Sequence, residues 1–221
     1  FVLIWIKRLK EAIHVEEIKF YCLIFLVSAV IITANLIHGA GYLPEEGFRH
    51  AFVQVGSIIT TAGFSSVDFD TWPALSKGII IMLMFVGGCA GSTCGGLKVS
   101  RVLIYLKTVK KELKQLCHPR NIKVINFDGK PLPHSVLRST NVFLITYILI
   151  FVISLFLICI DNFDGITNAT AVASALGNIG PGLSLVGPSR NFDLYSTFSK
   201  YVLMFDMLAG RLEIFPMLIL F

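Results

Sequence analysis

Apolar residues run along this chain in long blocks rather than in short alternating groups. Four blocks approach or reach the length of about 20 residues that a helix needs to cross a bilayer. They cover residues 20–37, 78–97, 141–160 and 197–221. Asp206, Arg211 and Glu213 interrupt the last one. The pattern predicts an all-α membrane protein.

A shorter helical stretch and a turn of small residues separate the blocks of each pair. In the first pair, the half-helix 48–59 precedes the first turn, residues 60–65; in the second, 166–176 precedes the second turn, residues 177–182. The half-helices are too short to span a membrane, and irregular backbone at membrane depth needs protein or water to satisfy its polar groups. We therefore expect two copies of one unit whose turns form a site for a small ion. A helical bundle with glycine-rich loops is the alternative.

The composition of both turns suits a monovalent cation. A helix C-terminus presents a partial negative charge, and a row of carbonyl oxygens after it can replace the hydration shell of an ion. Gly63 and Gly180 would allow the unusual backbone angles. Neither turn contains the carboxylates that divalent ions usually recruit. Side chains that could brace the turns are Thr60, Thr61, Ser65 and Asn178.

Five glycines interrupt the block 78–97. Each costs a helix interior roughly 1 kcal/mol relative to alanine. We interpret residues 87–96, the glycine loop, as a flexible break below the turns, although close helix packing through small residues is the alternative. A phosphate-binding loop is excluded because Leu97 separates Gly96 from Lys98.

Arg211 lies about fifteen residues into the last block, where a charge is costly and normally faces a partner or a wet cavity. It is either a positive barrier below the turns or one half of a salt bridge with Asp206 or Glu213. We expect Lys98 and Arg101 to face the cytoplasmic mouth and the lipid head groups.

The composition fits this reading. The chain is 55% apolar and 15% charged, with a mean hydropathy of +0.76. Ten of the 19 basic residues lie between Lys98 and Arg138, whereas acids outnumber bases in 38–77 and 161–200. The positive-inside rule then places 107–140 in the cytoplasm and both turns toward the outside. No aromatic interleaving favours nucleic acid as a partner.

The remaining features are local. Lys107, Lys110, Lys111 and Lys114 indicate a helix that continues past the membrane and ends near Cys117, and Asn126-Phe127-Asp128-Gly129 predicts a short hairpin. The five cysteines indicate no disulfide framework; Cys89 and Cys94 are expected to be small packing residues. No histidine, cysteine or serine constellation indicates an enzyme. Both ends of the chain read as cuts through a longer protein.

Four separated motifs resemble the Trk/Ktr/HKT superfamily of potassium transporters, closest to the bacterial Trk and Ktr membrane subunits. They are Thr61-Ala62-Gly63-Phe64, Gly87 to Lys98, Ala175 to Leu183 and Gly210-Arg211-Leu212-Glu213. The resemblance implies two helix–pore-loop–helix repeats that form half of a pseudo-fourfold, potassium-channel-like pore. Its domains would be 1–19, the cytoplasmic end of the preceding repeat; 20–117, the third repeat; 118–139, a cytoplasmic linker; and 140–221, the fourth repeat, truncated at its C-terminus.

The same resemblance implies potassium uptake across the cell (inner or plasma) membrane. The selectivity filter would comprise Thr61, Ala62, Gly63, Phe64, Asn178, Ile179, Gly180 and Pro181, with potassium on the backbone carbonyls of Thr61, Gly63, Asn178 and Gly180. The gate would comprise Gly87, Gly88, Gly91, Ser92, Thr93, Gly95, Gly96 and Arg211. It further implies a homodimer of full-length subunits, a cytosolic nucleotide-binding regulatory subunit and no covalently bound cofactor. A sodium-permeable or non-selective transporter, or a non-transporting fragment, is the alternative.

Overall fold

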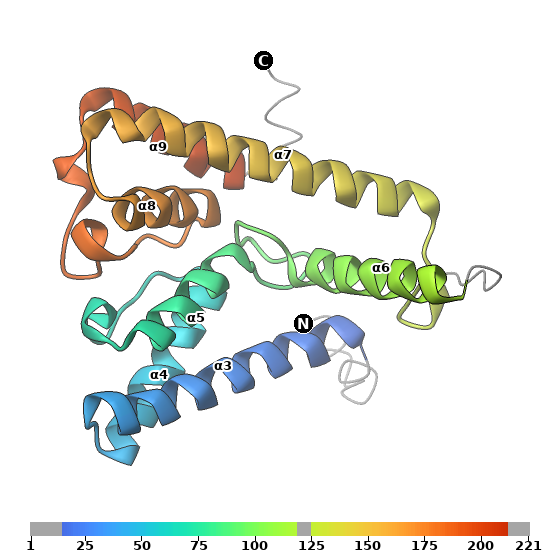
Figure 1. Cartoon of the computed structure of the whole chain (residues 1–221), viewed down its shortest axis with the longest axis horizontal. Coiled ribbons are helices and arrows are strands. Elements are labelled where there is room, and N and C mark those ends of the chain that lie inside the picture. Colours follow the sequence, from blue (N-terminus) through green and yellow to red (C-terminus); the bar gives the residue numbers. More distant parts are fainter. Residues whose placement is uncertain (1–14, 119–124, 212–221) are drawn as a thin grey trace.

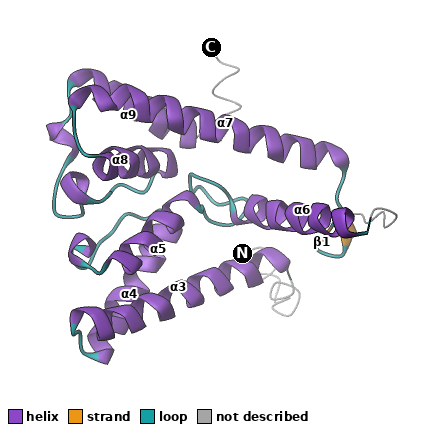
Figure 2. Cartoon of the chain, in the orientation of Figure 1, coloured by secondary structure: helices purple, strands orange, loops and turns teal. Residues whose placement is uncertain are grey.

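The computed structural model describes residues 15–118 and 125–211, and these residues are mostly helical (Figures 1 and 2). The elements in chain order are α3 (Glu16–Ala40), α4 (Pro44–Ile59), η1 (Phe69–Thr71), α5 (Ala74–Phe85), α6 (Val99–Cys117), β1 (Asn126–Phe127), β2 (Lys130–Pro131), α7 (His134–Ile158), η2 (Cys159–Asp161), α8 (Gly165–Gly177), η3 (Ser184–Val186), η4 (Phe192–Leu194) and α9 (Thr197–Arg211).

The helices form two similar units. In the first, the long helix α3 is followed by α4, a turn and α5; in the second, α7 is followed by α8, a turn and α9. Both long helices contain 25 residues. Figure 1 shows the units one above the other, with α6 extending to one side. The expected order of long helix, half-helix, turn and helix is present in both units.

Two of the predicted membrane spans are present as long helices. By length and composition, α3 and the stretch His134–Asp161 could cross a membrane. The apolar block 78–97 is helical only in its first part, because α5 ends at Phe85 and the glycine loop, the expected break, follows it. The last predicted span, 197–221, is described only as far as Arg211, where α9 ends.

The second turn packs against the core of the first unit. The larger apolar cluster contains Ile32, Leu36 and Ile58 of the first unit together with Ile179 and Leu183 of the second. A smaller cluster joins α7, α8 and α9. The two units therefore bury one continuous surface where the second turn meets the first unit.

The predicted hairpin after α6 is confirmed. Strands β1 and β2 pair antiparallel, and Asp128 and Gly129 between them have φ angles of +49° and +75°, typical of a two-residue type I′ turn. Lys107 of α6 donates a hydrogen bond to the carbonyl oxygen of Asn126 at 2.8 Å and pairs with the carboxylate of Glu16. The hairpin is thus attached to the start of α3.

Candidate ion pathway

The two turns share one backbone conformation. Thr61 and Asn178, which are 117 residues apart, follow their half-helices with left-handed φ angles of +54° and +53°. The amide after each returns to the helix, Ala62 to the carbonyl oxygen of Ser57 at 2.8 Å and Ile179 to that of Ser174 at 3.0 Å. This pattern is the Schellman ending of a helix. The expected repetition of the turn is therefore reproduced in the main chain.

The turns also meet each other. A Cβ atom added to Gly63 would lie 2.1 Å from the carbonyl oxygen of Ile179, so the main chains are in direct contact there. Gly63 has a φ of +77° and Gly180 one of +112°, both in the region that favours glycine. The predicted juxtaposition of the two glycine turns is therefore present.

The amide groups of the second turn donate hydrogen bonds to oxygens of α8 and of the segment that follows the turn. Gly180 donates to the hydroxyl of Ser174 at 3.1 Å, Gly182 to the carbonyl oxygen of Val186 at 2.7 Å, and Leu183 to the hydroxyl of Thr170 at 3.1 Å. No hydrogen bond within residues 15–118 and 125–211 ends on a carbonyl oxygen of residues 61–64 or 178–181. These oxygens remain available as ligands.

Side chains brace both turns, as expected for three of the four candidates. The Thr60 hydroxyl donates to the carbonyl oxygen of Gly56 at 2.7 Å, and the Ser65 hydroxyl donates to Oε1 of the fully buried Gln54 at 3.0 Å. The Asn178 amide donates to the carbonyl oxygen of Met207 at 3.0 Å. A cavity of about 590 Å³ adjoins Asn178, Ile179 and Gly180 on the side of α9.

The glycine loop is closed at its base. Leu97 donates to the carbonyl oxygen of Phe85 at 3.0 Å, and Val99 to that of Gly88 at 3.1 Å. Val86 and Leu97 form a parallel bridge. The chain therefore leaves the helical path after α5 and returns to it at the start of α6, which confirms the predicted break and rejects continuous helix packing.

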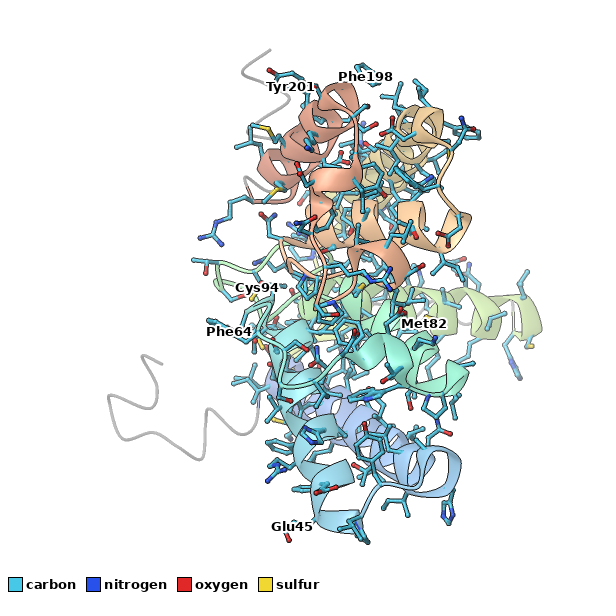
Figure 3. All side chains as sticks on the ribbon, turned by 90° about the vertical axis from the view of Figure 1, so that its left-hand side faces the viewer. Glu45, Phe64, Met82, Cys94, Phe198 and Tyr201 are labelled. Carbon is cyan, nitrogen blue, oxygen red and sulfur yellow. The ribbon has the colours of Figure 1, made fainter. Side chains whose placement is uncertain are left out.

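Close backbone approach explains one of the buried glycines of the loop. A Cβ atom on Gly95 would lie 2.6 Å from the carbonyl oxygen of Gly177, at the end of α8. The thiol of Cys94 donates to the carbonyl oxygen of Thr60 at 3.0 Å, so Cys94 does more than fill space. The loop thus contacts the ends of both half-helices. Figure 3 labels Cys94 and Phe64 of the first turn at the same edge of the molecule.

Arg211 contacts the same loop. Its guanidinium donates to the carbonyl oxygen of Thr93. Among the described residues Arg211 forms no salt bridge with Asp206, whose Oδ1 instead accepts a hydrogen bond from Ser154 at 2.6 Å. Glu213, the other proposed partner, lies outside the described residues. The structure thus places Arg211 beside the glycine loop, and its role as a positive barrier stays a prediction.

The prediction for Lys98 is wrong. Its side chain is 4% exposed, and its ammonium group donates to the carbonyl oxygens of Ser92 and Cys94 at 2.5 and 2.9 Å. The amide of Ala90 donates to the carboxylate of the buried Glu17 at 2.6 Å. The loop carbonyls offer Lys98 a better partner than lipid head groups do. Arg101 likewise stacks on Phe143, with 3.9 Å from Cζ to the ring centroid.

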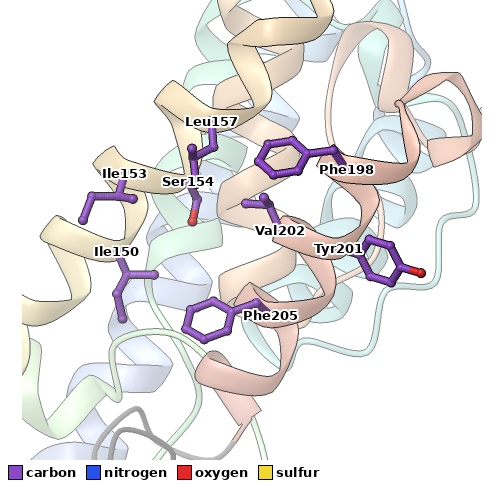
Figure 4. Close-up of a pocket in the computed structure, with 8 residues that line it drawn as sticks. All are labelled: Ile150, Ile153, Ser154, Leu157, Phe198, Tyr201, Val202 and Phe205. Atoms are coloured by element: carbon purple, nitrogen blue, oxygen red, sulfur yellow. The ribbon is translucent and has the colours of Figure 1, made fainter. Parts of the chain in front are cut away.

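An apolar groove lies apart from the turns, between α7 and α9 (Figure 4). It has a volume of about 450 Å³. Two of its lining residues, Ser154 and Tyr201, carry a hydroxyl group. Its other lining residues are Ile150, Ile153, Leu157, Phe198, Val202 and Phe205. Such a surface suits hydrocarbon rather than a hydrated ion.

Sequence reasoning missed several residues that support the site. These are Glu17, Gln54, Asp68, Asp70, Thr170 and Ser174. The sequence did contain a signal for Ser57 and Ser174, which lie in the half-helices before the two turns. They are 117 residues apart, like Thr61 and Asn178. The others sit on elements whose packing was not predictable from the sequence.

Comparison with known proteins agrees with this geometry. Residues 18–221 match the profile of the TrkH family of cation transport proteins. The Trk system potassium uptake protein TrkH from Halomonas elongata is 35% identical over 216 residues, which are 97% of this chain and 44% of that protein. The Trk system potassium uptake protein TrkG from Escherichia coli K12 is 33% identical over 221 residues, 100% of this chain and 45% of that protein.

The crystal structure of the potassium transporter TrkH from Vibrio parahaemolyticus superimposes with a TM-score of 0.83 at 36% identity, covering 92% of this chain and 43% of that one. This chain thus spans less than half the length of these relatives. The family is one of membrane transporters and not of enzymes, as the sequence indicated. The chain belongs to the TrkH family of cation transport proteins.

Proposed function

We propose that this chain provides half of a potassium uptake pathway, in which the carbonyl oxygens of the two turns strip water from the ion. The single observation that carries the proposal is the contact between Gly63 and the carbonyl oxygen of Ile179, made by two turns of the same conformation. Both half-helices direct their C-terminal ends toward this contact, which favours a cation. The names of the relatives favour potassium as that cation.

The candidate ligands are the carbonyl oxygens of Thr61, Gly63, Asn178 and Gly180, framed by Ala62, Phe64, Ile179 and Pro181. Four carbonyls supply only part of a dehydrated shell, so the corresponding turns elsewhere in the full-length protein would complete it. Residues 20–117 and 140–221 act as pore repeats in this proposal, with 1–19 and 118–139 on the cytoplasmic side. The turns open toward the outside of the cell membrane.

The glycine loop acts as the gate, and Arg211 holds it in the closed position. The loop reaches the ends of both half-helices through Gly95 and Cys94, and Arg211 donates to Thr93 at its tip. A guanidinium at this position repels a cation below the turns until the loop moves. A homodimer of full-length subunits and a cytosolic nucleotide-binding subunit near 107–140 would complete the assembly that moves it.

Ion flux into liposomes that contain the full-length protein tests the function. We expect potassium to enter at least about tenfold faster than sodium, which corresponds to about 1.4 kcal/mol. Equal flux of both ions would replace the proposal with a non-selective cation transporter, and no flux would reject it.

The Arg211→Ala variant tests the gate separately. Removal of the positive barrier and of its bond to Thr93 is expected to raise potassium flux by several-fold, about fivefold or more for about 1 kcal/mol. Arg190→Ala removes the same charge from an exposed position beyond η3 and should leave the flux unchanged. Unchanged flux in Arg211→Ala would reject the barrier while leaving the pathway intact.

A further inference from the structure

Two carboxylates of the first unit hold the segment that directly follows the second turn. Oδ1 of Asp70 accepts a hydrogen bond from the amide of Ser184 at 3.1 Å, and Oδ2 of Asp68 accepts one from the hydroxyl of Ser189 at 2.6 Å. These contacts join segments that are 114 and 121 residues apart. We call this set of four residues the outer clasp.

The carboxylates are themselves fixed in place. Oδ1 of Asp68 accepts from the amide of Asp70 at 3.0 Å, which caps η1, and Lys77 donates to the carbonyl oxygen of Asp70 at 3.0 Å. Phe69 and Trp72 on either side are 0% and 2% exposed. The clasp therefore extends from a rigid segment. A residue that positions another residue must itself be held in place.

The residue that Asp70 holds has an unfavourable backbone. Ser184 has a φ of +57°, which is uncommon for a residue other than glycine, asparagine or aspartate. It lies two residues after Gly182, whose amide closes the turn on Val186 at 2.7 Å. The hydrogen bond that the Ser184 amide donates to Asp70 offsets the cost of this conformation.

The equivalent residues of the second unit are used differently. Asn191 and Asp193 lie 123 residues after Asp68 and Asp70, and Asn191 also accepts from the amide two residues on, at 3.2 Å. The carboxylate of Asp193, however, accepts from Lys200 at 2.7 Å. Within the described residues, only the first unit uses this motif to reach across to the other unit's turn.

From these contacts we infer that Asp68 and Asp70 are positioning residues that set the geometry of the second turn and so its ion selectivity. They touch the backbone that continues from the turn, not the proposed ion site. The inference rests on the proposed function for its transport readout, but the clasp can also be tested without transport.

The transport test compares three variants of the full-length protein in liposomes. Asp70→Leu removes the acceptor and is expected to lower the ratio of potassium to sodium flux by about tenfold. Asp70→Asn keeps an acceptor oxygen without the charge and should stay within about twofold of the parent ratio. Glu45→Gln removes a negative charge from the exposed first turn of α4 and should change nothing.

Two outcomes overturn the inference. A parental ratio in Asp70→Leu would show that the turn does not need the bond. Equal loss in Asp70→Leu and Asp70→Asn would show that Asp70 acts as a negative charge at the mouth and not as an acceptor.

Oxidative cross-linking tests the contact by itself. The pair Asp68→Cys and Ser189→Cys should form a disulfide that mass spectrometry detects in the folded protein, whereas Glu45→Cys with Ser189→Cys should not. Absence of the first cross-link would overturn the clasp, even if Asp70→Leu does not fold. A parent without potassium transport would reject the proposed function but not a clasp that cross-links.

Discussion

The two turns have the same backbone conformation but different supports. The first turn ends a half-helix of its own unit, and Ser65 braces it against Gln54 within that unit. The second turn is held along its length by hydroxyl groups of α8 and by the outer clasp from the other unit. A repeated backbone therefore does not require repeated side chains, because any acceptor at the right place can satisfy an amide.

Their contacts with the glycine loop also differ. The loop reaches the first turn through a side chain, from the Cys94 thiol to the carbonyl oxygen of Thr60. It reaches the end of α8 through its main chain, where Gly95 approaches the carbonyl oxygen of Gly177. Movement of the loop would thus act on the second unit by direct backbone contact and on the first through one weak bond.

The largest effect is expected at the contact between the turns. In Gly63→Ala, the new methyl group would overlap the carbonyl oxygen of Ile179, and the positive φ would be strained as well. Potassium flux should fall by more than about a hundredfold, since overpacking costs about 1–3 kcal/mol and a strained φ about as much again.

In Gly180→Ala the positive φ would be strained, but the new methyl group would overlap no atom, because nothing lies within 4 Å of the added Cβ. Its flux should fall less than that of Gly63→Ala. The control is Gly78→Ala in α5, which has open space and a helical backbone, and it should transport like the parent. Equal activity of Gly63→Ala and Gly78→Ala would contradict the contact.

The next effect concerns stability on the side of the second turn. A Cβ on Gly210 of α9 would lie 2.0 Å from the carbonyl oxygen of Leu176. Gly210→Ala should therefore separate α9 from α8 and lower the free energy of unfolding by about 1–3 kcal/mol. The measurement is the shift in unfolding temperature in detergent, again against Gly78→Ala. A stabilised Gly210→Ala protein would show that helix propensity outweighs the overlap.

A smaller effect separates the two matched serines. Ser174→Ala removes the acceptor of the Gly180 amide and should lower stability by about 1 kcal/mol, with a modest loss of potassium selectivity. The Ser57 hydroxyl is buried and has no hydrogen-bond partner among the described residues, so Ser57→Ala should be neutral or slightly stabilising. Liposome flux and unfolding temperature measure both. If Ser174→Ala and Ser57→Ala behaved identically, the second turn would not depend on its serine more than the first turn does.

The smallest effect is expected at Asp193. The hydrogen bond and charge of Lys200 lower the pKa of this carboxyl group. The resulting stabilisation is present above the ordinary aspartate pKa of 3.8 and is lost as the pH falls through the lower pKa of the folded state. Asp193→Asn should therefore melt slightly below the parent at neutral pH, and the gap should close in acid. If the difference in unfolding temperature between Asp193→Asn and the parent widened in acid, the direction of the pKa shift would be contradicted.

Much of this arrangement was readable from local sequence. Period and length of the apolar blocks predicted α3 and α7, and the Asp128-Gly129 pair predicted the hairpin, because both depend on residues close in the chain. The repeated order of half-helix and small-residue turn, at 60–65 and 177–182, predicted the matching turns. The count of glycines predicted a break over residues 87–96, and α5 ends at Phe85, just before it.

The sequence by itself determined the two units and the glycines on which the turns depend, since these follow from apolar blocks, spacing and the absence of a Cβ atom. The family was indicated by the resemblance of four separated motifs to a known superfamily. Only the tertiary structure decided what supports the second turn. Asp70 and Ser184, Lys98 and Ser92, and Arg211 and Thr93 are brought together by packing between elements. A hydrogen bond between distant residues leaves no period in the sequence, because its geometry depends on how whole helices pack.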